Sequence, residues 1–169
     1  MSNRSLFFLL LFVLAIFLIV KFDVPTQVKI GVTNLIYGDE MRGIKGFQVS
    51  VDAPNPELEK DGLRREEVLQ ELTAKIEKAG VRSLPYELWQ KTPGKPSLSV
   101  SIQAVKLEKQ NYQYTVTLEV TKSEAEGSAP GSEKIKTIWA AYEMGEGGVS
   151  DIRDRINEKM GFFLRAHAR

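Results

Sequence analysis

The stretch Tyr112-Gln113-Tyr114-Thr115-Val116-Thr117-Leu118-Glu119-Val120-Thr121 decides the fold class of this chain. Apolar and polar residues alternate along it without interruption, which is typical of a strand with one face on a core and the other in water. Such a strand needs cover on its apolar face only. The neighbouring sequence must therefore supply partner strands and the helices that cover that face.

Further strands are indicated on both sides of this stretch. We expect them over Phe47–Val51, Val81–Leu84, Leu98–Leu107 and Ile135–Met144. The alternation slips in phase within the third of these, which predicts a bulge near Ala104. The segment Lys109–Asn111 is short enough to join the two central strands as a hairpin.

Two segments carry apolar residues at helical spacing. The first stripe consists of Val68, Leu72 and Ile76, and Gly80 follows it where a left-handed helix end favours glycine. The second stripe is Ile152, Ile156, Met160 and Phe163, with Ser150 as the expected N-cap and Asp151 and Asp154 in the first turn.

These elements predict an α+β fold. We expect two amphipathic helices on one face of a mostly antiparallel sheet of about five strands, preceded by an N-terminal transmembrane helix. The initial strand–helix–strand order predicts one right-handed parallel crossover. Residues 44–169 would form this domain, with a mobile loop at 123–133, where no large apolar residue occurs.

The N-terminal segment is the most apolar part of the chain. Leu6–Val20 contains 15 consecutive apolar residues, and Phe22 lies just beyond Lys21. As a helix, residues 6–22 would span about 26 Å, between a signal-peptide core and a short transmembrane helix. No small-x-small cleavage site follows, which favours an uncleaved signal anchor over 1–22 and a tether over 23–43. A cleaved signal peptide and a buried core helix are the alternatives.

Composition excludes several classes of function. The chain has a formal charge of +1, which gives no electrostatic reason to expect nucleic-acid binding. It has no cysteine, so disulfides, thiolate metal sites and a lipidated cysteine are excluded. The only histidine is His167, which we expect to be exposed at a fraying terminus. We therefore predict neither cofactor nor metal.

Three polar clusters are candidates for chemical sites. The run Gly145–Gly148 has the outline of an anion cradle before a helix, but nearby acidic residues oppose an anion. Asp39-Glu40 and the pair Asp151/Asp154 lie in polar, glycine-flanked contexts that would not separate their pKa values. We interpret them as a turn and as helix-start charges, and predict no enzyme activity.

The strand around Trp139 offers a candidate docking surface. If Ile138, Ala140, Tyr142 and Met144 pack under the helices, strict alternation puts Ile135 and Trp139 on the open face. Thr115 and Thr117 of the neighbouring strand would lie beside them. An exposed tryptophan on a sheet indicates a partner-binding patch. A bulge, or the opposite phase, would instead bury Trp139.

The whole pattern resembles a family of uncharacterised bacterial envelope proteins with a leading hydrophobic segment and one α+β domain. The residues that carry the likeness are Gly43-Ile44-Lys45-Gly46-Phe47, Lys78-Ala79-Gly80-Val81, Lys91-Thr92-Pro93-Gly94, Tyr112-x-Tyr114-x-Val116 and Trp139. More loosely, the order of elements is similar to envelope accessory domains such as the N-terminal domain of the Tol–Pal translocation protein. Those domains bind proteins and are not enzymes, whereas the family itself implies no known activity.

The expected function is a non-enzymatic binding or assembly module, held in the membrane by residues 6–22 and facing the periplasm. Its expected partner is another envelope protein. One alternative is a protein secreted after signal-peptide cleavage. The alternative functions are a small-ligand-binding protein or hydrolase that uses carboxylates in a pocket, and a purely structural envelope protein.

Overall fold

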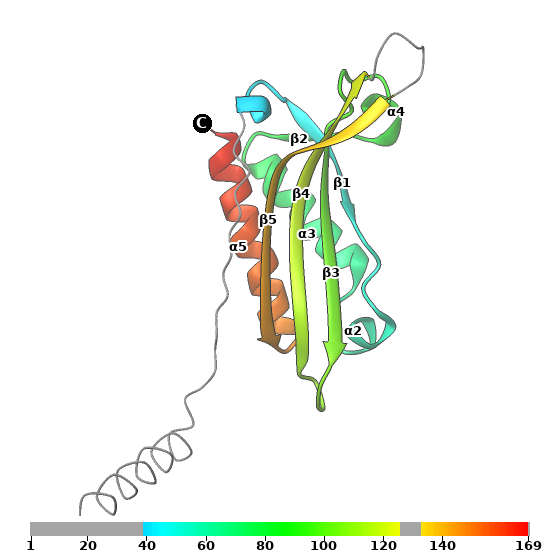
Figure 1. Cartoon of the computed structure of the whole chain (residues 1–169), viewed down its shortest axis with the longest axis vertical. Coiled ribbons are helices and arrows are strands. Elements are labelled where there is room, and N and C mark those ends of the chain that lie inside the picture. The colour runs from blue at the N-terminus through cyan, green and yellow to red at the C-terminus, as the bar shows by residue number, and fades with distance from the viewer. Residues whose placement is uncertain (1–38, 126–132, 169) are drawn as a thin grey trace, which may run out of the picture.

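The computed structural model of the chain describes residues 39–125 and 133–168. Its strands form one sheet in the order β2-β1-β3-β4-β5 (Figure 1). The strands are β1 (Gly46–Val51), β2 (Arg82–Ser83), β3 (Ser97–Lys106), β4 (Tyr112–Ala125) and β5 (Glu133–Gly147). β1 is parallel to both β2 and β3, and the remaining neighbours are antiparallel. The α+β class is confirmed, and the sheet is mixed, with two parallel pairings where one was expected.

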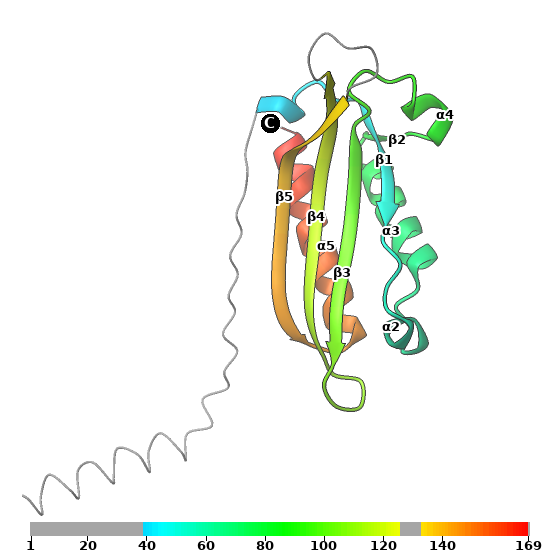
Figure 2. The ribbon, with the colours of Figure 1, turned by 45° about the vertical axis from the view of Figure 1, so that its right-hand side comes forward.

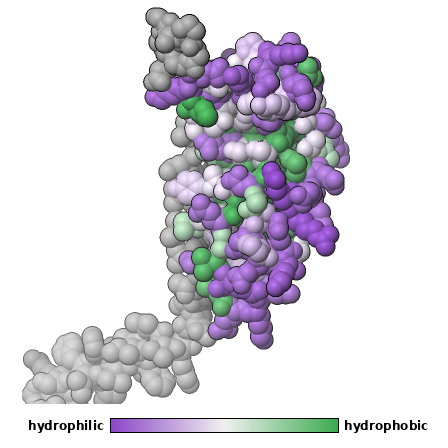
Figure 3. All heavy atoms as spheres, turned by 90° about the vertical axis from the view of Figure 1, so that its right-hand side faces the viewer, coloured by the Kyte–Doolittle hydropathy of each residue, from purple (hydrophilic) through white to green (hydrophobic). Residues whose placement is uncertain are grey.

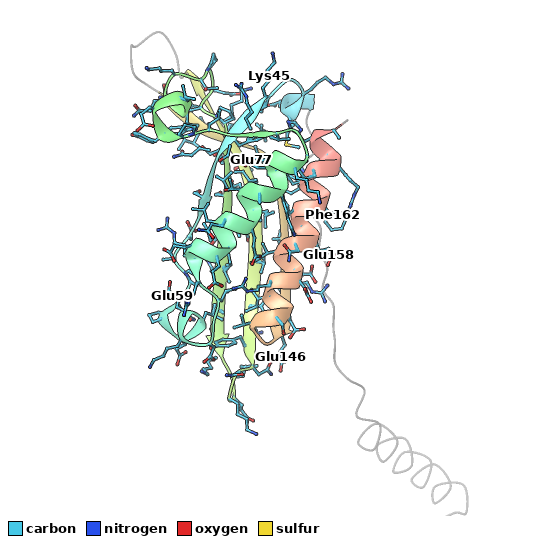
Figure 4. All side chains as sticks on the ribbon, turned by 180° about the vertical axis from the view of Figure 1, so that it is seen from behind. Lys45, Glu59, Glu77, Glu146, Glu158 and Phe162 are labelled. Atoms are coloured by element: carbon cyan, nitrogen blue, oxygen red, sulfur yellow. The ribbon has the colours of Figure 1, made fainter. Side chains whose placement is uncertain are left out.

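The helices lie on one face of this sheet. The described helical elements are η1 (Asp39–Met41), α2 (Pro56–Lys60), α3 (Arg65–Lys78), α4 (Tyr86–Trp89) and α5 (Val149–His167). The long helices α3 and α5 lie side by side behind the strands, and the other sheet face carries no helix among the described residues (Figures 1, 2 and 4). The side chain of Lys75 on α3 donates a hydrogen bond to Asn157 on α5.

The core fills the space between the sheet and the two long helices. The predicted apolar stripes supply it: Val68, Leu72 and Ile76 of α3, and Ile152, Ile156, Met160 and Phe163 of α5, are all buried. The apolar positions of β4 face them, from Tyr112 through Val120. Burying a leucine- or isoleucine-sized side chain contributes about 1.5–3 kcal/mol, so this layer stabilises the fold.

The predicted glycine at the end of α3 is confirmed, whereas the predicted N-cap of α5 is wrong. Gly80 follows α3 with a φ of 80°, and its amide donates to the Glu77 carbonyl, as the C-cap prediction requires. The N-cap of α5 is Gly148, not Ser150. The Gly148 amide donates a hydrogen bond to the Asp151 carboxylate at 2.8 Å. Asp151, three residues after the N-cap, therefore supplies the side-chain capping that Ser150 was expected to provide.

Two expected boundaries around the 123–133 loop are corrected. β4 continues to Ala125 and β5 begins at Glu133, because the pairs Ser123–Ile135 and Ala125–Glu133 extend the ladder beyond the apolar part of both strands. Residues 126–132 lie outside the described part of the chain. β5 also runs through the glycines to Gly147, where it pairs with Tyr112.

The irregularity of the sheet lies in β5 and not in β3. β3 pairs with β4 from Ser97 to Lys106 without a change of register, so the predicted bulge near Ala104 is absent. In β5, Trp139 pairs with Val120 while Thr137 pairs with Thr121, which leaves Ile138 as an extra residue. Ile138 and Trp139 are both buried in the core, as a bulge of two residues opposite one permits.

The N-terminal predictions fall largely outside the described residues. The expected anchor over 1–22 and residues 23–38 of the expected tether are not described. Among the described residues, no helix combines the length and apolar character needed to cross a membrane. The end of the expected tether belongs to the domain, because Met41 of η1 is 4% exposed and Glu40 lies 2.7 Å from the Lys136 ammonium of β5.

Candidate partner-binding face

The open face of the sheet carries an almost uncharged polar surface. Its rows follow from the strand register: the pair Gln103–Thr115 is followed by Ser101–Thr117, Ser99–Glu119 and Ser97–Thr121. β5 extends all four rows, with Met144, Tyr142, Ala140 and Thr137. Across these rows of β3, β4 and β5, Glu119 is the only charged residue on the face.

Thr115 and Thr117 both lie on this face, with Thr117 nearer its centre and Thr115 one row nearer the hairpin. Thr117 pairs with Ser101 on one side and with Tyr142 on the other, and the side chains are half-buried by their neighbours. The serine and threonine side chains of β3 and β4 are short, so a flat partner surface can approach these two strands closely. Interface cores are typically depleted in charge and enriched in tyrosine and methionine, and Tyr142 and Met144 supply these residue types here.

Ile135 is exposed but distant from the two threonines. It pairs with Ser123, six residues along β4 from Thr117, or roughly 20 Å at the rise of a strand. Its side chain is 72% exposed. The structure therefore does not bring Ile135 together with Thr115 and Thr117 into one patch.

Trp139 does not lie on the open face. Its side chain is 1% exposed, and its ring packs edge-on against Phe163 of α5 with centroids 5.7 Å apart. The bulge at Ile138 changes the phase of β5, which leaves Thr137 on the open face and turns Trp139 toward the helices. The alternative in which a bulge buries Trp139 is the one that the structure adopts.

The single carboxylate of these rows, Glu119, is held within the sheet. The Thr137 hydroxyl donates a hydrogen bond to Glu119, which lies one strand away. This bond crosses from β5 to β4 beside the bulge. The carboxylate is thereby engaged by its own domain, and the remainder of the central face presents hydroxyl, amide and apolar groups.

Beneath the sheet, a buried charge cluster joins β5 to α5. Lys159 is 2% exposed, and its ammonium lies 2.6 Å from the Glu143 carboxylate. Arg155 contacts the same carboxylate at 3.3 Å. Burial raises the pKa of the neighbouring Tyr114 phenol, which keeps it protonated as a hydrogen-bonding group. Every charge in this cluster has a partner, as buried charges require.

A second cluster closes the hairpin end of the domain. Asp61, just after α2, accepts a hydrogen bond from the Tyr112 hydroxyl at 2.5 Å and lies 2.9 Å from the Lys106 ammonium. The hydrogen bond from Tyr112, and then Lys106, lower the pKa of the Asp61 carboxyl. Burial and the same carboxylate raise the pKa of Tyr112. These groups join α2 to the sheet.

Of the other polar candidates from the sequence, Asp151 and Glu40 have structural partners. A side chain at Gly147 would meet the Asp151 carboxylate at 2.6 Å, so the helix's own acid occupies the place of an anion in the expected cradle. Glu40 is held by Lys136. Among the described residues, no three His, Asp or Glu side chains are grouped closely enough to hold a metal ion.

His167 is packed and not frayed, contrary to expectation. Its Nε2 lies 2.7 Å from the Ile44 carbonyl, and its ring packs edge-on against Phe47 and at a tilt against Phe163, with centroids 5.6 and 6.0 Å apart. The aromatic contacts compensate for the loss of chain entropy at the helix end. His167 thus fixes the last turn of α5 to the chain segment that leads into β1.

Sequence reasoning missed Lys159, although a signal was present. Lys159 follows Ile156 by three residues and precedes Phe163 by four, which places it inside the apolar stripe of α5. A lysine in such a stripe must either extend to water or meet a buried acid. Glu143 of β5 is that acid. The sequence of β5 does not show which face of the sheet its acidic residues occupy.

Comparison with known proteins gives no family. No family model matches the chain, and no curated protein matches it. Among solved structures, the chain is similar to PelC of Paraburkholderia phytofirmans, solved as a dodecamer of a point variant, with 16% identity and a TM-score of 0.37. That likeness covers 64% of this chain and 81% of the PelC chain. A likeness at this level does not establish a shared fold.

Proposed function

We propose that this protein is a non-enzymatic binding or assembly module, anchored in a membrane by residues 6–22, with its domain on the extracytoplasmic side. The partner is another protein of the cell envelope, and it docks on the open sheet face. The observation that carries the proposal is the near absence of charge across the centre of that face.

The contrast with the rest of the surface supports this docking role. The described helices present many charged residues to solvent, such as Glu66 and Lys78 of α3 and Asp154 of α5. The central rows of the open face present only Glu119. Solvent-facing sheets usually gain solubility from charged side chains, so an uncharged face of this extent is better suited to a covered surface.

The anchoring part of the proposal is supported by sequence. Fifteen consecutive apolar residues followed by Lys21 suit a short transmembrane helix whose lysine reaches the lipid interface. The resemblance to bacterial envelope proteins supports the extracytoplasmic side. Intact-mass analysis of membrane-extracted protein, together with extraction at alkaline pH, tests this part: loss of the first residues, or release of the protein, contradicts an anchor.

Photo-cross-linking in native membranes tests the docking part. A photoreactive phenylalanine analogue in place of Tyr142 should give one dominant protein adduct, identified by mass spectrometry. Adding Thr117→Arg should abolish that adduct, because an arginine in the centre of the face prevents close approach. Gln70→Arg, on the exposed surface of α3, is the matched control. An adduct that survives Thr117→Arg contradicts docking on this face.

A further inference from the structure

We propose that the η1 end of the domain docks onto the anionic bilayer surface in which the N-terminal segment is anchored. The η1 end is defined here as η1, the start of β1, β2, α4, the segment 91–96, the end of β4 and the start of β5. This inference rests on the proposed function, because it requires residues 6–22 to be in a membrane. It adds which surface of the domain faces the lipid.

The elements of this end are tied together by direct contacts. The Ser123 amide of β4 donates to the Gly94 carbonyl at 2.7 Å, and the Lys95 ammonium lies 2.6 Å from Glu133 at the start of β5. The Arg82 amide of β2 donates to the Lys45 carbonyl beside β1. Segments from distant parts of the chain therefore share one end of the molecule, at the top of Figure 1.

Large apolar side chains project from this end. Tyr86 and Leu88 of α4 are 54% and 55% exposed, and Ile135 of β5 is 72% exposed. Figure 3 shows hydrophobic residues set among strongly hydrophilic ones at the top of the molecule. Tyrosine beside aliphatic residues is the composition that membrane–water interfaces favour.

Cations surround these apolar residues. Lys45, Arg82, Lys91 and Lys134 are exposed and make no ion pair among the described residues. The acids Glu40 and Glu133 of this end are paired with Lys136 and Lys95, and Glu87 of α4 lies among the cations. Unpaired lysine and arginine side chains near an anionic leaflet attract the protein to the surface.

The opposite end has the reverse charge, which selects between the two ends. Val105, Leu107 and Met144 are also exposed, at the hairpin end. That end carries acidic residues, and Figure 4 shows Glu59 and Glu146 there, with Lys45 at the other end of the long axis. An anionic surface repels the acidic end and attracts the basic one.

The chain also enters the domain at the basic end. The described residues begin at η1, which packs against β5, and sixteen residues separate Phe22 from Asp39. That length of chain allows the η1 end to touch the bilayer surface. Docking there stands the long axis of the domain away from the membrane and leaves the open sheet face accessible to a protein partner.

Fluorescence quenching by lipids tests the orientation on the full chain. Because the chain has no cysteine, single cysteines can carry an environment-sensitive dye in place of Ala15, Leu88 or Gln110. The protein is placed in nanodiscs of phosphatidylcholine alone or with phosphatidylglycerol, containing spin-labelled lipid as quencher. With the anionic lipid, we expect strong quenching at Ala15 and Leu88 and little at Gln110, which lies in the hairpin.

Charge reversals provide the matched control. Lys45→Glu combined with Lys91→Glu should lower quenching at Leu88 to the level at Gln110, as should high salt or removal of phosphatidylglycerol. Lys60→Glu combined with Lys109→Glu makes the same change in net charge at the hairpin end and should leave quenching at Leu88 unchanged. Thermal unfolding of each variant checks that the domain is intact.

Each remaining outcome contradicts one of the two proposals. Equal quenching at Leu88 and Gln110, stronger quenching at Gln110, or quenching at Leu88 that ignores lipid charge overturns docking of the η1 end. An unquenched dye at Ala15 shows that the N-terminal segment is not in the bilayer, and in that case it is the proposed anchor that fails.

Discussion

The Lys159 ammonium lies 2.6 Å from the Glu143 carboxylate in the space between α5 and β5, with only 3% and 12% of the two side chains exposed. Taking two charges out of water costs several kcal/mol each, so each group depends on the other. Arg155 also contacts Glu143, whereas Lys159 has no second acid among the described residues. Within the described part of the chain, Glu143 therefore has two cationic partners, whereas Lys159 has one acidic partner.

This inequality predicts different costs for removing each partner. Glu143→Gln leaves Lys159 buried without a counter-ion and should lower the free energy of unfolding by about 3–5 kcal/mol. Lys159→Met leaves Glu143 paired with Arg155 and should cost clearly less. Urea unfolding of the full chain in detergent, followed by circular dichroism, measures both. Equal losses of unfolding free energy in the two variants would contradict the conclusion that Lys159 depends on Glu143 more than Glu143 depends on Lys159.

Trp139 should act through stability and not through partner binding. Trp139→Ala opens a cavity beneath α5 and should lower the free energy of unfolding by about 3–5 kcal/mol. Trp139→Phe keeps the packing against Phe163 and should cost less. Ile135→Ala, at an exposed position, should change stability by less than about 0.5 kcal/mol. Thermal unfolding compares the three variants, and a mild effect of Trp139→Ala would contradict its burial.

Two glycines should respond in opposite directions to alanine. A Cβ at Gly145 would lie 2.7 Å from the Tyr114 hydroxyl, so Gly145→Ala should shift the two strands and destabilise the domain. Gly161 lies within α5, where a Cβ would meet only Arg165 Nη1, at 3.5 Å. Gly161→Ala should raise the free energy of unfolding by about 0.5–1 kcal/mol through helix propensity. Differential scanning calorimetry measures both shifts.

The Asp61 cluster predicts a pH dependence with a definite sign. The folded state lowers the pKa of Asp61 below its ordinary value of 3.8. The stabilisation is therefore complete above that value and is lost as the pH falls through the lower folded pKa. Tyr112→Phe removes the hydrogen bond that contributes most to the shift, and should reduce this loss. Unfolding midpoints of both proteins between pH 7 and strong acid should converge as the pH falls.

The sequence predicted the parts of this fold that depend on periodicity. Val68, Leu72 and Ile76 are buried as their spacing requires, and β4 alternates as its residues do. Whether Trp139 points toward the helices or toward the open face depends on one extra residue, Ile138, in β5. Ile138 and Trp139 are both apolar, so the residue types do not reveal the bulge. The burial of Lys159 depends on an acid in a different element, which local spacing cannot show.

β5 is an outer strand of the sheet, and its bulge affects how readily another copy of the protein can pair with it. A long straight outer strand invites the same strand of another copy to add to it. The extra residue at Ile138 interrupts the regular spacing of backbone groups, and the exposed Lys134 adds a positive charge to the same strand. We expect this irregular edge to oppose strand addition between neighbouring copies.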